Sequence, residues 1–93
     1  MEQNTKQSRI EALYQFLADI QDPRDICALL EDLCTRKEVE NMAERVFAAK
    51  LLMQGNTYNQ VMSRTSISSA TLSRVSRCVQ YGAGYSRLLK TEE

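Results

Sequence analysis

The sequence predicts an all-α fold of about six helices. Apolar residues recur at spacings of three and four, which is the period of a helix with one buried face. Serine, threonine or aspartate stands before most of these runs, where its side chain can cap a helix, and glycine and proline fall between the runs. The alternation that marks a half-buried strand is nearly absent. The 93 residues are therefore expected to form one helical domain over residues 1–93.

The first part of the chain predicts two helices. Ser8 and Glu11 have the spacing of a capping box, in which each side chain binds a backbone N–H group at the helix start. Further along, Asp22 is placed to cap a second helix whose first position is Pro23. The apolar positions are Ile10, Leu13, Leu17 and Ile20 in the first helix, and Ile26, Leu29, Leu30 and Leu33 in the second. Each of these helices is thus amphipathic.

The third predicted helix is the longest. Thr35–Glu38 forms another capping box, and the helix is expected to run to about Gln54 and to end at Gly55. Its apolar residues are Val39, Met42, Ala43, Val46, Phe47, Ala49, Leu51, Leu52 and Met53. Because they spread around most of the circumference, the helix needs burial on nearly all sides, which one short chain can hardly provide. We expect a homodimer with its core in residues 1–56; a central helix in a compact monomer is the alternative.

Residues 57–80 predict a helix-turn-helix unit. Thr57 is placed to cap a short helix over residues 58 to about 64, and Ser68 caps a second helix that ends near Gln80. The residues expected to pack between these two helices are Val61, Met62, Ile67, Leu72 and Val75. Many such units have glycine where this chain has Ser66, so a left-handed turn there would carry strain. Residues 81–93 form the C-terminal segment, in which Gly82 and Gly84 precede a last short helix.

The helix-turn-helix unit is expected to bind double-stranded DNA. Small, mostly hydroxylated residues follow Ser68, and such residues allow close entry into a major groove, where hydroxyl and methyl groups meet base edges. Polar residues of the first helix would contact flanking phosphates, which positions the protein without reading sequence. The candidate DNA-binding residues are Asn59, Gln60, Ser63, Arg64, Ser68, Ser69, Ala70, Thr71, Ser73 and Arg77. An ordinary helical hairpin is the alternative interpretation.

The charge distribution favours the same conclusion. Residues 1–44 carry ten acidic and five basic side chains, whereas residues 45–90 carry seven basic side chains and no acidic one. Wherever this second stretch folds, it presents a positive surface that attracts polyanions, nucleic acid above all. The alternative is a solvated basic surface with no partner.

The composition excludes several other classes of function. The chain has no histidine, which removes Ser-His-Asp and Cys-His catalysis and the ordinary zinc sites, and it has no glycine-rich phosphate loop. We therefore expect neither an enzyme nor a metal site. Its three cysteines have no clustered spacing and read as reduced thiols. No apolar run is long enough to span a membrane, and the first residues lack an apolar signal region, so a cytoplasmic protein is expected.

The sequence resembles the Trp repressor superfamily, and within it the YerC/YecD-type branch, from about Leu30 to Leu89. The segments that carry the resemblance are Leu33-Cys34-Thr35, Ala43-Glu44-Arg45-Val46, Leu51-Leu52-Met53-Gln54-Gly55 and Ala70-Thr71-Leu72-Ser73-Arg74. The resemblance implies a Trp-repressor-like bundle that forms an intertwined homodimer. Each helix-turn-helix would enter one of two successive major grooves, with half-sites about one helical turn apart.

The resemblance also implies an effector pocket. Thr35, Arg45 and Arg74 match pocket residues of the tryptophan-sensing repressor, and an arginine pair could clamp a carboxylate and stack on a ring. Cys78 replaces a serine that holds the ligand's amino group, and Val75 replaces a glycine that leaves space for the indole. A small anionic or amino-acid effector is thus the expectation, with tryptophan itself disfavoured by Val75. Alternatively, the two arginines are structural or contact DNA phosphates.

Taken together, these features predict a bacterial-type, homodimeric helix-turn-helix transcriptional regulator. We expect a repressor that blocks polymerase access to an operator and that responds to an effector if the pocket is functional. The alternative is a small interaction module that uses the basic C-terminal half to bind a protein or RNA. Preference for particular duplexes over single strands would separate the two functions.

Overall fold

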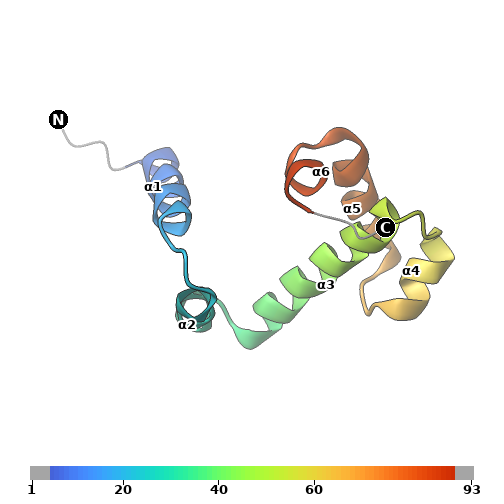
Figure 1. The fold of residues 1–93 in the computed structure, drawn as a ribbon, viewed down its shortest axis with the longest axis horizontal. Coiled ribbons are helices and arrows are strands. Elements are labelled where there is room, and N and C mark those ends of the chain that lie inside the picture. Colours follow the sequence, from blue (N-terminus) through green and yellow to red (C-terminus); the bar gives the residue numbers. More distant parts are fainter. Residues whose placement is uncertain (1–4, 90–93) are drawn as a thin grey trace. The chain divides into compact units, whose positions relative to one another are not determined.

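The computed structural model describes residues 5–89, and these residues form six α-helices and no strand (Figure 1). The helices are α1 (Lys6–Ala18), α2 (Pro23–Leu33), α3 (Arg36–Met53), α4 (Tyr58–Arg64), α5 (Ser69–Tyr81) and α6 (Gly84–Leu88). The predicted all-α fold is therefore confirmed. The chain divides into an N-terminal unit, residues 1–35, and a C-terminal unit, residues 36–93. This division places α3 in the same unit as the helix-turn-helix.

The N-terminal unit contains α1 and α2, each with a defined cap. Thr5, not Ser8, caps α1: its hydroxyl accepts a hydrogen bond from the Ser8 N–H (3.1 Å), and the Ser8 hydroxyl accepts one from the Thr5 N–H (3.0 Å). The prediction was wrong by one turn because Ser8 can serve at either position of a capping box. Asp22 caps α2 with Pro23 at its first position, as predicted.

Arg24 stabilises the ionised form of the Asp22 carboxylate. Its guanidinium forms an ion pair with Asp22 at 2.9 Å, and its backbone N–H also donates to that carboxylate at 2.9 Å. Both hydrogen bonds lower the pKa of Asp22 below its ordinary value, the side-chain bond contributing more than the backbone bond. Ionisation of Asp22 therefore strengthens the cap at the start of α2.

Neither α1 nor α2, both described throughout, contains a buried residue. Their large exposed apolar side chains are Ile10, Leu13, Tyr14, Phe16, Leu17, Ile26 and Leu33. Two short helices with that much uncovered apolar surface lack the buried area that a stable fold requires. Their apolar faces therefore need a surface that covers them.

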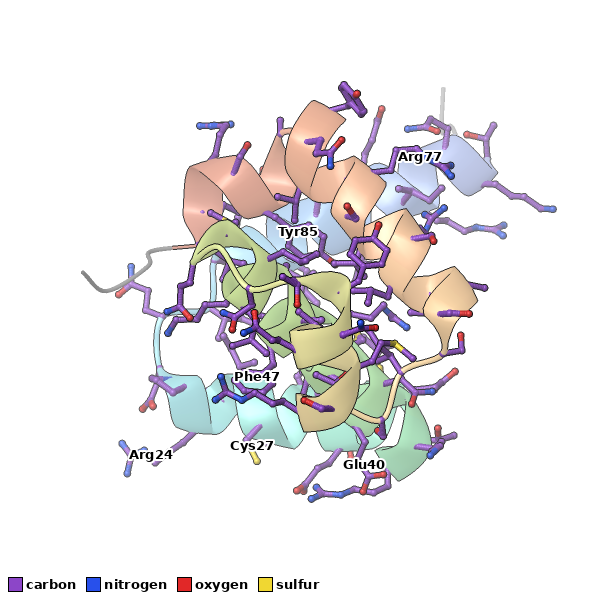
Figure 2. The ribbon with its side chains drawn as sticks, turned by 90° about the vertical axis from the view of Figure 1, so that its right-hand side faces the viewer. Arg24, Cys27, Glu40, Phe47, Arg77 and Tyr85 are labelled. Atoms are coloured by element: carbon purple, nitrogen blue, oxygen red, sulfur yellow. The ribbon has the colours of Figure 1, made fainter. Side chains whose placement is uncertain are left out.

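The core of the protein lies in the C-terminal unit. Its fully buried apolar residues are Ala48, Ala49, Leu51, Val61, Leu72 and Val75, and the partly buried Leu52, Ile67, Val79, Tyr85 and Leu89 pack against them. Figure 1 shows α4, α5 and α6 gathered around the C-terminal half of α3, and Figure 2 places Tyr85 among these helices. Four of the five predicted packing residues lie in or against this core. The exception is Met62, which is 37% exposed.

The end of α3 is fixed by a left-handed glycine. Gly55 has φ +97°, a conformation that other residues rarely adopt, and the Asn56 N–H returns to the Leu51 carbonyl at 3.1 Å. The Asn56 side-chain amide also donates to that carbonyl, at 2.9 Å. The predicted end at Gly55 is confirmed, and the resulting turn sets the direction in which α4 begins.

One side of the C-terminal unit carries an uncovered apolar hollow of about 480 Å³. It is lined by Val46, Cys78, Gly82, Gly84, Tyr85, Leu88 and Leu89. Val46 is 44% exposed and Leu88 is 75% exposed, and Phe47 is also exposed. The chain thus leaves part of α3 uncovered, as its apolar circumference had indicated. None of the described helices is long and apolar enough to cross a membrane.

Candidate nucleic-acid interface

The first helix of the helix-turn-helix begins with a complete capping box. The Thr57 hydroxyl accepts the Gln60 N–H at 3.2 Å, and the Gln60 side-chain oxygen accepts the Thr57 N–H at 2.7 Å. Gln60 is exposed and was predicted to contact phosphate, but its carbonyl oxygen is already used in the cap. Its side-chain amide therefore remains as the group that can donate to a phosphate.

The second helix, α5, begins with the predicted Ser68 cap. The Ser68 hydroxyl accepts the Thr71 N–H at 3.1 Å and donates to the Thr71 hydroxyl at 3.0 Å. Thr71 is half-buried, and its hydroxyl accepts a hydrogen bond within the cap, so its contact with bases stays a prediction. Ser69, Ala70 and Ser73 are exposed and give α5 a surface of small side chains.

Most of the predicted DNA-binding residues lie on the exposed surface of α4 and α5. These exposed residues are Asn59, Gln60, Ser63, Arg64, Ser68, Ser69, Ala70, Ser73 and Arg77. Arg64 lies over the ring of Phe47, with 5.6 Å between the guanidinium carbon and the ring centroid. Figure 2 shows Phe47 on α3 beside α4, and Arg77 on α5. With no acidic residue from 45 to 89, these arginines give the surface its positive charge.

A polar hollow of about 280 Å³ extends this surface along α5. It is lined by Tyr58, Ser73, Ser76, Arg77, Gln80 and Tyr81. Gln80 and Tyr81 were not singled out from the sequence, although they follow Arg77 at the spacings of three and four that share a helix face. The hollow combines one guanidinium group with hydroxyl and amide groups, which are the groups that contact DNA phosphates.

The turn between α4 and α5 is attached to α3 by a carboxylate. Glu44 Oε1 accepts hydrogen bonds from the Ser66 N–H at 2.8 Å and from the Ser66 hydroxyl at 3.2 Å. No non-glycine residue in the described range has a positive φ, so the left-handed strain expected at Ser66 is absent. Sequence reasoning missed Glu44 because its partner is 22 positions away, beyond any local motif.

The three candidate effector residues of the C-terminal unit do not line one hollow. Arg45 lines a polar hollow of about 330 Å³, whose lining is Lys37, Asn41, Arg45, Ser66, Ile67, Ser68 and Thr71. Cys78 lines the separate apolar hollow beside Val46, and Arg74 is exposed on α5. Thr35 belongs to the N-terminal unit.

Two further residues of the polar hollow were not singled out from the sequence. One residue that was expected beside a bound ligand lies in the core instead. Lys37 and Asn41 precede Arg45 by eight and four positions, so a helical spacing on α3 could have revealed them. Val75, expected to intrude on a bound ring, is only 1% exposed and packs in the core.

Comparison with known proteins agrees with this architecture. The family model described as Trp repressor protein matches residues 8–93. The uncharacterised protein YerC of Bacillus subtilis (strain 168) is 36% identical over 73 residues, which cover 78% of this chain and 70% of YerC. A TrpR-like protein from Eubacterium eligens ATCC 27750 superimposes with a TM-score of 0.86 at 32% identity, covering 95% of this chain and 96% of that one.

A second solved structure, of a Trp repressor candidate from Staphylococcus aureus, gives a TM-score of 0.83 at 27% identity and covers 91% of each chain. The sequence, the six-helix fold and the matched length agree, and they confirm the resemblance found in the sequence. The chain belongs to the Trp repressor family.

Proposed function

We propose that this protein is a sequence-specific DNA-binding transcriptional regulator, a homodimer that represses by occupying an operator. The observation that carries the proposal is the exposed surface of α5, where small side chains lie beside arginines in a stretch without acidic residues. Small residues permit close approach to base edges, and the positive charge attracts the phosphate backbone. Membership of a family of DNA-binding regulators supports the same function.

Different residues of this surface take different tasks. Ser69, Ala70 and Ser73 are placed to read bases in the major groove, because they are exposed and small. Arg64 and Arg77 contact phosphates and fix the position of α5 on the duplex. Removing a base-reading group therefore changes sequence preference, whereas removing a phosphate contact weakens binding to all sequences.

The homodimer is supported by apolar surface that the single chain leaves uncovered. Neither α1 nor α2 contains a buried residue, and the apolar hollow beside Val46 is open. A second copy that covers these faces removes apolar area from water, which is the main source of stability in obligate dimers. Two copies of α5 then meet successive major grooves, about 34 Å apart along the duplex.

A response to a small anion is supported by the polar hollow at Arg45. Lys37 and Arg45 supply two positive charges there, and Thr71 supplies a hydroxyl donor, because the hydroxyls of Ser66 and Ser68 already donate to Glu44 and Thr71. A carboxylate or another small anion fits this chemistry. The hollow lies at the start of α5, so its occupancy would act on the recognition helix. Arg45→Ala should abolish the response of DNA binding to such a ligand, and Arg87→Ala, which removes an exposed arginine of α6, is the control.

Selection of bound duplexes from a random pool tests the main proposal. We expect enrichment of a two-fold symmetric site whose half-sites lie about one helical turn apart, with affinity that falls as salt rises. On the selected duplex, Ser73→Ala should relax preference at one position of each half-site. Arg77→Ala should weaken selected and unrelated DNA alike and reduce the salt slope by about 1 per subunit.

Two outcomes would contradict the proposal. Stronger binding to single-stranded RNA than to any selected duplex would favour the interaction module, as would complete absence of duplex binding at low salt. Equal effects of Ser73→Ala on every sequence would show that Ser73 does not read bases.

A further inference from the structure

The hydrogen bonds between Glu44 and Ser66 link α3 to the turn that precedes the recognition helix. One carboxylate oxygen accepts both the backbone N–H and the hydroxyl of Ser66, at 2.8 and 3.2 Å. The capping hydrogen bonds of α4 and α5, by contrast, join residues only three positions apart. They hold each helix start together but do not fix one helix relative to another. The Glu44–Ser66 contact does restrain the turn before α5 relative to α3, because it joins residues 22 positions apart on these two elements.

We propose that Glu44 is a positioning residue that sets the orientation of α5 for base recognition, an inference that rests on the proposed function. Ser66 lies two residues before the Ser68 cap, so a restraint on Ser66 is a restraint on the first turn of α5. That turn carries the exposed Ser69 and Ala70.

The charge of Glu44 argues that its role is geometric. It is the last acidic residue before a stretch of 47 residues with none, and it lies on the helix-turn-helix side of α3. A carboxylate there repels a polyanion, so it opposes affinity for DNA in general. The adjacent Ile67 already packs against the core and attaches the turn by apolar contact. Ile67 thus holds the turn against the core without Glu44, and Glu44 sets the orientation of the turn.

Three variants separate this role from a general one. Glu44→Ala removes the acceptor. Glu44→Gln keeps a side-chain oxygen that accepts both Ser66 hydrogen bonds and removes the charge. Glu40→Ala is the matched control: it removes a carboxylate one turn earlier on α3, where Glu40 forms only an exposed ion pair with Arg36 at 3.5 Å.

The first readout is amide hydrogen exchange at Ser66 and over the first turn of α5, which needs no DNA. We expect faster exchange at these amides in Glu44→Ala, and wild-type rates in Glu44→Gln and Glu40→Ala. The second readout is the ratio of affinities for the selected duplex and an unrelated duplex. That ratio should fall about tenfold in Glu44→Ala and return in Glu44→Gln, while the melting temperature changes little.

Each result decides one claim. Unchanged exchange at Ser66 in Glu44→Ala overturns the contact itself, whether or not a duplex is selected. Faster exchange with an unchanged affinity ratio overturns the positioning role and leaves the proposed DNA-binding function intact. A wild-type protein that selects no duplex overturns the proposed function, and with it the role of Glu44 in recognition. Equal loss in Glu44→Ala and Glu44→Gln would show that charge, not hydrogen bonding, is what matters.

Discussion

Placing a charge at Val46 tests the proposed dimer most directly. In the single chain Val46 is 44% exposed and lines the apolar hollow with Leu88 and Leu89. Burial of a whole valine side chain stabilises by about 1.5–3 kcal/mol, so covering the exposed part gives about 1 kcal/mol per subunit. Val46→Asp loses that term and also desolvates a carboxylate, at a cost of several kcal/mol per ion. Two copies together exceed 4 kcal/mol, which raises the dimer dissociation constant by at least about a thousandfold.

Sedimentation equilibrium over a range of protein concentrations measures this shift. Val46→Thr, which nearly preserves shape and adds no charge, should weaken the dimer far less and serves as the control. Circular dichroism on the same samples separates dissociation from loss of helix. A Val46→Asp protein that keeps the wild-type dissociation constant would refute the reasoning, since Val46 would then stay in water. A wild-type chain that is a stable monomer at all concentrations would refute the dimer.

Two further predictions concern stability. Leu72 is 0% exposed in the helix-turn-helix core, so Leu72→Ala should reduce the free energy of unfolding by about 2–5 kcal/mol, measured by urea titration; a loss below 1 kcal/mol would show that the core repacks easily. Asp22 has a depressed pKa, so its stabilisation of α2 is present above the ordinary aspartate pKa and is lost as the pH falls through the depressed value. Asp22→Ala should therefore lower helicity more at neutral pH than in acid, by circular dichroism; a difference of the same size at both pH values contradicts this account of the cap.

Local rules predicted most of the fold. Asp22, Thr57 and Ser68 cap their helices as expected, and Gly55 ends α3 in a left-handed conformation. These features depend on residues within five positions of each other, so the sequence displays them directly. The cap predicted at Ser8 was wrong because the Thr5–Ser8 and Ser8–Glu11 capping boxes overlap in the sequence. Periodicity alone does not choose between them.

The site was less accessible to sequence reasoning because it depends on contacts between elements. Glu44 meets Ser66 across 22 positions, and nothing near Glu44 indicates that contact. Thr71 looked exposed on α5, but the turn brings it to the hollow that Arg45 lines. The family resemblance placed Arg45 and Cys78 in one pocket; in the single chain they line different hollows, and the effector pocket stays a prediction. These contacts depend on how α3 packs against the helix-turn-helix, which local sequence patterns do not show.

The position of α3 connects these results. Its buried residues, Ala48, Ala49 and Leu51, support the helix-turn-helix, Glu44 holds the turn before α5, and Val46 faces the open apolar hollow. One rigid helix thus lies between the surface proposed to meet a second copy and the helix proposed to read DNA. Any change in how two copies pack along Val46 would move the two α5 helices relative to each other and alter their spacing. Because two half-sites fix that spacing to the helical repeat of DNA, a loosened dimer should lose affinity for its operator while it keeps affinity for unrelated DNA.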